Sequence, residues 1–308
     1  MREENKIVSQ EIDGVSFKLK EKADFSFLSK FGRVFCVFDQ NDSGNISFGV
    51  ENTTGQKFFI KVAGAKTVES FQSPEQAVVS LKETIVIYEN LRHDRLIELI
   101  TSDSFQNLFF VVFKWSEGEC LFDHWNFDYY SKHPEVSSPK EKFNRLLLKE
   151  KIKVSKQILD FVIHVESKKY GLVDFYDGSL MYDFEENTLT ICDIDLFKER
   201  PFINHMGIDY WGTKRVKAPE EYENGARIDE RTAVFTIGAL FFNLYGKYSK
   251  EELAEIYKEN CFIPVEKKNW SLSEDLYDIA LKAVNALPEN RYSTVFEFQD
   301  KWLEALNI

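Results

Sequence analysis

The amino-acid sequence predicts an α+β fold of two lobes, a small β-rich N-lobe followed by a larger helical C-lobe. Between residues 32 and 115, period-two patterns and turn residues indicate five strands with a single helix among them. After a break at residues 116–118, apolar residues recur at helical spacings instead. We therefore expect an N-terminal arm or extra strand over residues 1–24, the N-lobe over 25–115 and the C-lobe over 116–308.

The N-lobe begins with a β-meander. The alternation of Val34, Cys36 and Phe38 predicts a strand that places these three side chains on one face. Turn residues separate it from a second strand expected over residues 46–50 and a third over 57–62.

A helix is expected over residues 73–90. Ser73 has the side chain of an N-cap, and Pro74 suits the first helical position because its missing N–H is not needed there. Two more strands are expected near residues 96–102 and 108–115.

The C-lobe carries an apolar stripe at gaps of three, four and seven residues, which predicts one long helix. Its members are Phe143, Leu147, Val154, Ile158, Phe161 and Val165. A strand-rich stretch is expected over 171–197, and further helices near 231–245, 273–285 and 294–306. Thr294 and Glu297 have the spacing of a capping box at the start of the last helix.

Charge and composition restrict the function classes. The 308 residues carry a formal net charge of -12, which repels phosphate backbones and disfavours binding to nucleic acid. No apolar run is long enough to span a membrane, and the first residues lack the apolar core of a signal peptide. The four cysteines are far apart and form no CxxC pair, as expected of reduced thiols. We expect a cytoplasmic protein that binds neither nucleic acid nor membrane.

Two short motifs narrow the fold. Residues 212–220 read GTKRVKAPE, and residues 288–293 read PENRYS. They resemble the GTxxYxAPE segment and the PxxRxT signature of the protein kinase-like superfamily, so the chain resembles a divergent bacterial-type serine/threonine kinase over residues 27–306. In that family the glutamate of APE pairs with the arginine, which implies a structural pair of Glu220 and Arg291.

The resemblance implies a set of ATP-binding residues in the N-lobe. Lys61, in a strand similar to VAIK, would bind the ATP phosphates, and Glu83 on the following helix would hold it, with Glu89 also on that helix. Gly44 takes the place of the third glycine in the phosphate-covering loop. The remaining contacts, from backbone groups to the adenine, are assigned to Lys114 and Ser116.

The resemblance also implies the catalytic residues and the cofactors, ATP and Mg²⁺. Asp174 takes the place of the base that accepts the proton of the substrate hydroxyl. Asp193 takes the place of the principal magnesium ligand, and Ser179 that of the second, normally an asparagine. The residues that could replace this asparagine instead are Asp177, Asp183 and Asp195.

Several positions depart from the kinase pattern. Asp39 and Asp42 would add negative charge beside a polyphosphate. Tyr176 replaces the lysine that steadies the γ-phosphate, and Lys214 or Arg215 could supply the missing positive charge.

Two more departures concern regulation and bracing. Leu172 and Val173 replace the histidine and arginine before the catalytic aspartate, and residues 194–212 contain no Ser or Thr. We therefore predict no activation by Ser/Thr phosphorylation within 194–212. Ala233 stands where an aspartate normally braces the catalytic loop, so another group must brace it.

Three functions follow from these matches and departures. The first is an ATP-dependent phosphotransferase acting on Ser or Thr of a protein substrate. The second is a pseudokinase, a scaffold that binds a nucleotide or a protein partner without turnover. The third is a small-molecule kinase, which the motifs at Glu220 and Arg291 disfavour because such kinases generally lack them.

Overall fold

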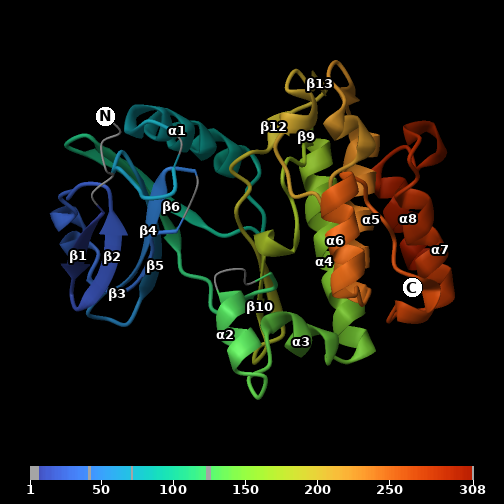
Figure 1. The fold of residues 1–308 in the computed structure, drawn as a ribbon, viewed down its shortest axis with the longest axis horizontal. Helices are drawn as coiled ribbons and strands as arrows, with labels where there is room; N and C mark the ends of the chain where they lie inside the picture. Colours follow the sequence, from blue (N-terminus) through green and yellow to red (C-terminus); the bar gives the residue numbers. More distant parts are fainter. Residues whose placement is uncertain (1–6, 41–42, 71, 123–125, 307–308) are drawn as a thin grey trace. The chain divides into compact units, whose positions relative to one another are not determined.

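The computed structural model describes the chain except for residues 1–6, 41–42, 71, 123–125 and 307–308. The chain divides into two compact units. Unit 1 comprises residues 1–92 and 97–116, and unit 2 comprises residues 93–96 and 117–308. Unit 1 is rich in strands and unit 2 in helices, so the predicted α+β class is confirmed (Figure 1).

Unit 1 is built on a five-stranded antiparallel sheet with the order β3-β4-β5-β7-β6. Its strands are β3 (Arg33–Phe38), β4 (Asn45–Glu51), β5 (Lys57–Ala63), β6 (Leu99–Phe105) and β7 (Leu108–Lys114). The strand predicted from residue 96 begins later because Leu96 instead forms a bridge with Ile191 in unit 2. The N-terminal arm is a hairpin rather than a single strand, formed by β1 (Val8–Ile12) and β2 (Val15–Leu19).

The predicted face of β3 is wrong because the strand contains a bulge. The pairing with β4 shifts register between Val34 and Cys36, so the residues after the bulge change face. Val34 is buried and Val37 packs against the core, whereas Phe38 is exposed.

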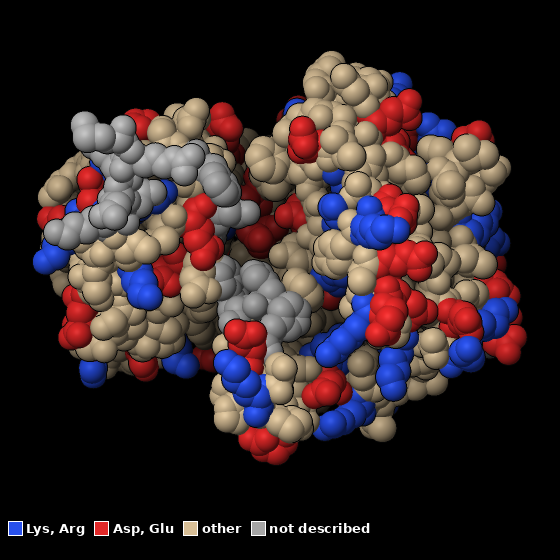
Figure 2. All heavy atoms as spheres, in the orientation of Figure 1, with Lys and Arg blue, Asp and Glu red and all other residues tan. Residues whose placement is uncertain are grey.

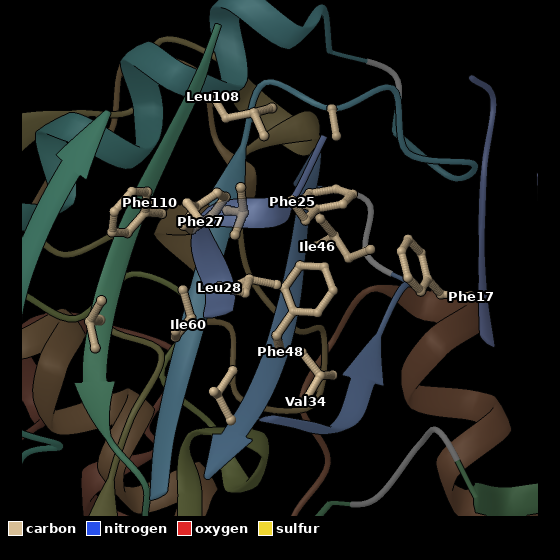
Figure 3. Packing of buried hydrophobic residues seen from close by; sticks show 14 of the residues in the cluster. Phe17, Phe25, Phe27, Leu28, Val34, Ile46, Phe48, Ile60, Leu108 and Phe110 are labelled. Carbon is tan, nitrogen blue, oxygen red and sulfur yellow. The ribbon is translucent and has the colours of Figure 1, made fainter. Parts of the chain in front are cut away.

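One face of the sheet is covered by aromatic side chains from the N-terminal part of the chain. Figure 3 shows Phe25, Phe27 and Leu28 packed against Ile60 and neighbouring strand residues. Phe27 and Leu28 belong to the 3₁₀ helix η1 (Ser26–Lys30), and Phe25 is its N-cap residue. This cluster is the hydrophobic core of unit 1.

The opposite face of the sheet is covered by α1 (Pro74–Asn90), which lies along it in Figure 1. Ser73 accepts a hydrogen bond from the backbone N of Gln76, and the Gln76 side chain accepts one from the Ser73 backbone. The predicted N-cap and the proline at the first position are therefore confirmed. Tyr88 contacts Phe113 of β7 with ring centroids 4.8 Å apart, which fixes the helix against the sheet.

Unit 2 is mainly helical. Its helices are α2 (Phe127–Lys132), α3 (Pro139–Asn144), α4 (Leu148–Ser167), α5 (Glu230–Tyr245), α6 (Lys250–Glu259), α7 (Glu274–Ala283) and α8 (Val295–Ala305). Short strands in the segments between these helices pair with one another. They are β8 (Glu119–Cys120) with β10 (Leu180–Asp183) and β11 (Thr188–Ile191), β9 (Tyr170–Gly171) with β12 (Lys198–Glu199), and β13 (Phe202–Ile203) with β14 (Arg227–Ile228).

The single long helix predicted from Phe143 to Val165 is wrong at its start. Phe143 lies on the separate helix α3, and Leu147 is the exposed N-cap residue of α4. The stripe from Val154 to Val165 is buried on α4 as predicted. The chain changes direction between the two helices while both apolar faces stay buried, so the sequence spacing alone did not show the break.

The core of unit 2 surrounds α5, which is buried along almost its whole length. Trp302 of α8 packs against Phe241 of α5, with ring centroids 4.7 Å apart, and its indole N–H donates to Ser155 of α4. None of the helices among the described residues is long and apolar enough to cross a membrane.

Candidate active site

Asp174 and Asp193 have unusual backbone conformations. Asp174 has φ 56° and Asp193 has φ 54°, in the left-handed region that side chains other than glycine seldom adopt. The other non-glycine residues with positive φ in the described chain lie in turns, whereas these two aspartates do not. Such conformations outside turns are concentrated at functional sites.

Thr213 holds the Asp174 carboxylate in place. Both the backbone N and the hydroxyl of Thr213 donate to Asp174 Oδ1, at 2.8 Å and 2.9 Å. Gly212 precedes it with φ 129°, a conformation that favours glycine. Gly212 and Thr213 of the sequence motif thus orient the predicted base. The sequence did not indicate this role for Thr213.

Tyr176 lies near both aspartates. Burial raises the pKa of its hydroxyl, and the negative charges of Asp174 and Asp193 raise it further. Asp174 and Asp193 therefore lie close to one phenol, although they are far apart in the sequence. A neutral phenol occupies the position where the kinase pattern has a cation.

A backbone hydrogen bond links the segments that contain the two predicted metal ligands, Ser179 and Asp193. Cys192, which precedes Asp193, donates its backbone N–H to the carbonyl of Ser179 at 2.9 Å. The Ser179 side chain is fully buried, and its Oγ has no hydrogen-bond partner among the described residues. A hydroxyl and a carboxylate are hard oxygen donors, the kind that Mg²⁺ prefers. In the described part of the chain, however, no three His, Cys, Asp or Glu side chains are grouped to hold a metal by themselves.

Asp177 and Arg215 bind each other and not a ligand. The Arg215 guanidinium donates to both Asp177 oxygens, at 2.7 Å and 3.1 Å, and both side chains are buried. Arg215 also donates to Asn243 of α5, whose amide donates back to the Arg215 carbonyl. Asp177 is thus a poor replacement for the metal-binding asparagine, and Arg215 cannot steady a phosphate. This network joins the loop at Asp177 to α5.

The other proposed substitutes are also engaged. Asp183 accepts hydrogen bonds from the backbone N of Glu185 and Glu186, at 2.8 Å and 3.0 Å, and so closes a turn. Lys214 donates to the carbonyl of Tyr257 at 3.1 Å. Asp195 is half-buried two residues beyond Asp193.

Glu220 and Arg291 form a bidentate ion pair. The guanidinium donates to the two carboxylate oxygens at 2.7 Å and 2.9 Å, and both side chains are largely buried. Thr232 donates its hydroxyl to Glu220 at 2.7 Å. Arg291 also donates to the carbonyl of Arg231 in α5. The two motifs that contain Glu220 and Arg291 are therefore joined to each other and to α5.

Sequence reasoning did not single out two ionisable residues beside this pair, Lys217 and Glu221. Both side chains are buried. Burial lowers the pKa of Lys217, which donates to the carbonyl of Tyr210. Burial raises the pKa of Glu221 to about 8, and its carboxyl accepts from the backbone N of Ala218 at 2.7 Å. In the sequence, the only signal for them was their charge, at Lys217 inside the motif of residues 212–220 and at Glu221 directly after it.

In unit 1, Lys61 is a buried lysine of β5. Its neighbours Ile60 and Val62 belong to the hydrophobic core, so the alternation of the strand places Lys61 on the face covered by α1. Glu83 is exposed, whereas the buried stripe of α1 contains Leu81 and Thr84. The structure therefore does not bring Glu83 to Lys61, because the helix turns that position toward solvent. Glu89 is exposed as well.

The other predicted ATP contacts of unit 1 have identifiable neighbours. Gly44 has φ 80°, and a Cβ there would approach Ser70 Oγ to 2.9 Å. Asp39 accepts from the backbone N of Lys18 at 2.7 Å, so its carboxylate is held by β2. The backbone N of Lys114 donates to the Glu98 carbonyl at 2.9 Å. Asp42 lies outside the described residues, and Ser116 is the half-buried last residue of unit 1.

No protein-family model matches this chain, and no curated protein matches it.

Proposed function

We propose that this chain is an ATP-dependent phosphotransferase with a protein-kinase-like two-lobe fold, which acts on a Ser or Thr hydroxyl of a protein substrate. The observation that carries the proposal is the pair of Asp174 and Asp193. Each has a left-handed backbone conformation outside any turn. The negative charges of both add to the effect of burial in raising the pKa of the Tyr176 hydroxyl. Phosphoryl transfer needs two such carboxylates, one for the substrate proton and one for the metal.

Asp174 would accept the proton of the substrate hydroxyl. A general base must be positioned within hydrogen-bond reach of the proton it removes. The two hydrogen bonds from Thr213 to Asp174 Oδ1 limit the rotation of the carboxylate. Orientation by a neighbouring group is the usual way in which such a base is kept ready.

Asp193 and Ser179 would hold Mg²⁺, with phosphate and water completing its octahedral shell. When bound, this ion supplies charge neutralisation for the nucleotide phosphates. Glu83 has no part in the proposal because it faces solvent.

Nucleotide binding and turnover test the proposal separately. ATP with Mg²⁺ at about 100 times its dissociation constant should raise the free energy of unfolding by roughly 2.7 kcal/mol. Asp193→Asn should abolish the metal-dependent part of this shift. Asp275→Asn, which removes the same charge from the exposed first turn of α7, should not. A shift that is unchanged in Asp193→Asn would refute the assigned metal site.

Turnover is measured as phosphate transfer from labelled ATP to a mixture of candidate proteins. Asp174→Asn should keep the ATP-dependent stabilisation and lower the rate by roughly 10²–10⁴-fold, the usual contribution of a general base. Equal rates for Asp174→Asn and the unchanged protein would show that Asp174 is not the base.

One observation favours the pseudokinase as the second candidate. Tyr176 replaces the catalytic-loop lysine, and the cations of the neighbouring motif are engaged elsewhere. Lys214 and Lys217 each donate to a backbone carbonyl, and Arg215 binds Asp177. Stabilisation by ATP without any phosphate transfer would favour this scaffold function.

A further inference from the structure

A small cavity in unit 1 lies where the end of β2, the residue before β4, the β5–α1 connection and the first turn of α1 meet. Its volume is about 140 Å³, several times the roughly 10–15 Å³ that a single water needs. None of the described residues that line it is acidic, although the chain carries 51 acidic and 39 basic residues. Its polar lining consists of Lys20, Lys66, Thr67, Ser70, Gln72 and Ser73.

The hydroxyl of Thr67 is the feature that points to a ligand. Thr67 is 1% exposed, and its Oγ1 has no hydrogen-bond partner among the described residues. Its backbone is tied down by a bridge to Leu19 and a hydrogen bond to the carbonyl of Ala65. Buried polar groups without partners are rare in native proteins, and a bound group is one way to satisfy them.

The charges around the cavity favour an anion. Lys20 Nζ donates to the carbonyl of Ser70 at 3.1 Å, which holds the ammonium group beside the cavity. Lys66 also lines it and pairs with Glu21 at 2.8 Å. Glu75 interacts with Lys66 and Ser73 from the first turn of α1, but neither glutamate lines the cavity.

The cavity also receives the N-terminal end of α1, a helix of 17 residues. The partial positive charge of a helix N-terminus attracts anions such as phosphate. Gly44 lines the cavity as well, and a Cβ at that position would approach Ser70 Oγ and Ala77 Cβ to 2.9 Å and 3.0 Å. The absent side chain therefore keeps this wall of the cavity open.

We propose that this cavity binds a phosphate group, carried by free inorganic phosphate or by a small phosphomonoester. A tetrahedral oxyanion accepts several hydrogen bonds, and the donors here are the Thr67 hydroxyl and the ammonium groups of Lys20 and Lys66. The site uses neither Lys61 nor any residue of unit 2. Of its described lining residues, Gly44 is the one that the kinase resemblance also assigns to ATP.

The full-length protein is titrated with sodium phosphate while sodium chloride keeps the ionic strength constant. Binding is followed by calorimetry and by the unfolding temperature. The unchanged protein should show saturable binding and a rising unfolding temperature. Thr67→Val, which keeps the shape but removes the donor, should bind phosphate at least tenfold more weakly. Its unfolding temperature without phosphate should be unchanged or higher, because an unsatisfied buried hydroxyl has been removed.

A matched pair of lysines provides the control. Lys20→Met should weaken phosphate binding at least tenfold, whereas Lys22→Met removes the same charge outside the cavity and should not. Glycerol 3-phosphate serves as the second ligand. Tighter binding than inorganic phosphate would identify a phosphomonoester as the ligand, and weaker binding would identify free phosphate.

Two results would overturn the proposal. One is a phosphate titration indistinguishable from that with chloride alone. The other is phosphate binding that survives in both Thr67→Val and Lys20→Met, since binding would then take place elsewhere. Should Thr67→Val not fold, the comparison of Lys20→Met with Lys22→Met decides the question.

Discussion

The ion pair of Asp177 and Arg215 is the centre of a buried polar network in unit 2. Arg215 also lies over the Phe122 ring, with its guanidinium carbon 4.1 Å from the centroid. Asn243 satisfies further donors and acceptors of the arginine. These contacts offset part of the cost of burying the two charges, although Arg215 Nε has no hydrogen-bond partner among the described residues. The loop that contains Asp174 is thereby fixed to α5.

Removing one partner of this pair should be strongly destabilising. Asp177→Asn or Arg215→Met leaves an uncompensated buried charge or its unsatisfied partner, so we expect the free energy of unfolding to fall by about 3–5 kcal/mol. Urea denaturation followed by circular dichroism measures this change. Lys258→Met breaks an exposed pair with Glu259 and should cost less than about 1 kcal/mol. Equal effects at the two sites would contradict the buried network.

Glu221 makes stability depend on pH. Its pKa is raised to about 8, mainly by burial, whereas an unfolded glutamate titrates near 4.5. Between these values the folded protein holds a proton that the unfolded chain has lost. Stability therefore falls as the pH rises through this window, and above about pH 8 the full cost of the buried charge is present.

Glu221→Gln should remove this dependence. The free energy of unfolding of the unchanged protein should fall by up to about 1.4 kcal/mol per pH unit between pH 5 and pH 8 because of this group. The glutamine keeps an acceptor for Ala218 and cannot ionise, so its stability curve should be flatter and higher at pH 8. Denaturation at several pH values tests this. Glu223→Gln, at an exposed position, should leave the slope as it is.

At the scale of elements, the bulge in β3 depends on a glycine in the neighbouring strand. Cys36 pairs with Gly49 of β4, directly after the register shift. A Cβ at Gly49 would lie 2.4 Å from Cys36 Sγ and 2.7 Å from the Phe35 ring. The two side chains of the bulged strand thus occupy the space that the glycine leaves.

Gly49→Ala should therefore disturb the edge of the sheet. We expect a loss of about 1–3 kcal/mol in the free energy of unfolding, the usual cost of inserting a methyl group into filled space. Combining it with Cys36→Ala should recover part of the loss, because the sulfur atom is then absent. A double-mutant cycle by denaturation measures this coupling. Strict additivity of the two changes would show that the sulfur atom is not the obstacle.

Capping residues were the most reliable signals for helices. They predicted the start of α1 at Ser73 and of α8 at Thr294, which accepts from the backbone N of Glu297. At α8 the glutamate reaches the backbone of Ser293 and not of Thr294, so the capping box is only half formed. The helix α6 was missed although Ser249 and Glu252 form a complete capping box there. Its apolar face is narrow, with a single fully buried side chain, which explains the weak signal.

At the scale of the whole molecule, the net charge of -12 follows directly from the sequence and governs the repulsion between molecules. On the face shown in Figure 2, acidic and basic side chains are interspersed over unit 2. Repulsion between molecules should keep the protein dispersed at neutral pH and vanish near its isoelectric point of about 5.1.

Solubility should thus pass through a minimum near pH 5. It is measured as the protein concentration that remains in solution with a fixed amount of ammonium sulfate. Replacing the exposed Lys22 and Lys30 by glutamate should move the minimum to lower pH. A minimum that stays in place would mean that solubility follows local contacts and not net charge.

Much of the fold followed from local patterns in the sequence. The strands β4, β5 and β7, the helix α1 and the buried stripe of α4 agree with them because alternation, helical spacing and capping depend on residues close in the chain. The face of β3 and the break between α3 and α4 did not follow. A bulge is fixed by the partner strand, and a turn between two buried helices by what they pack against.

The same division applies to the candidate site. The sequence by itself singled out Asp174, Asp193, Ser179 and the pair of Glu220 with Arg291, because these lie in short motifs with recognisable spacing. Only the tertiary structure decided that Glu83 faces solvent, that Asp177 is taken by Arg215, and that Thr213 holds Asp174. A motif specifies which groups are present, whereas their partners come from distant parts of the chain and are chosen by packing.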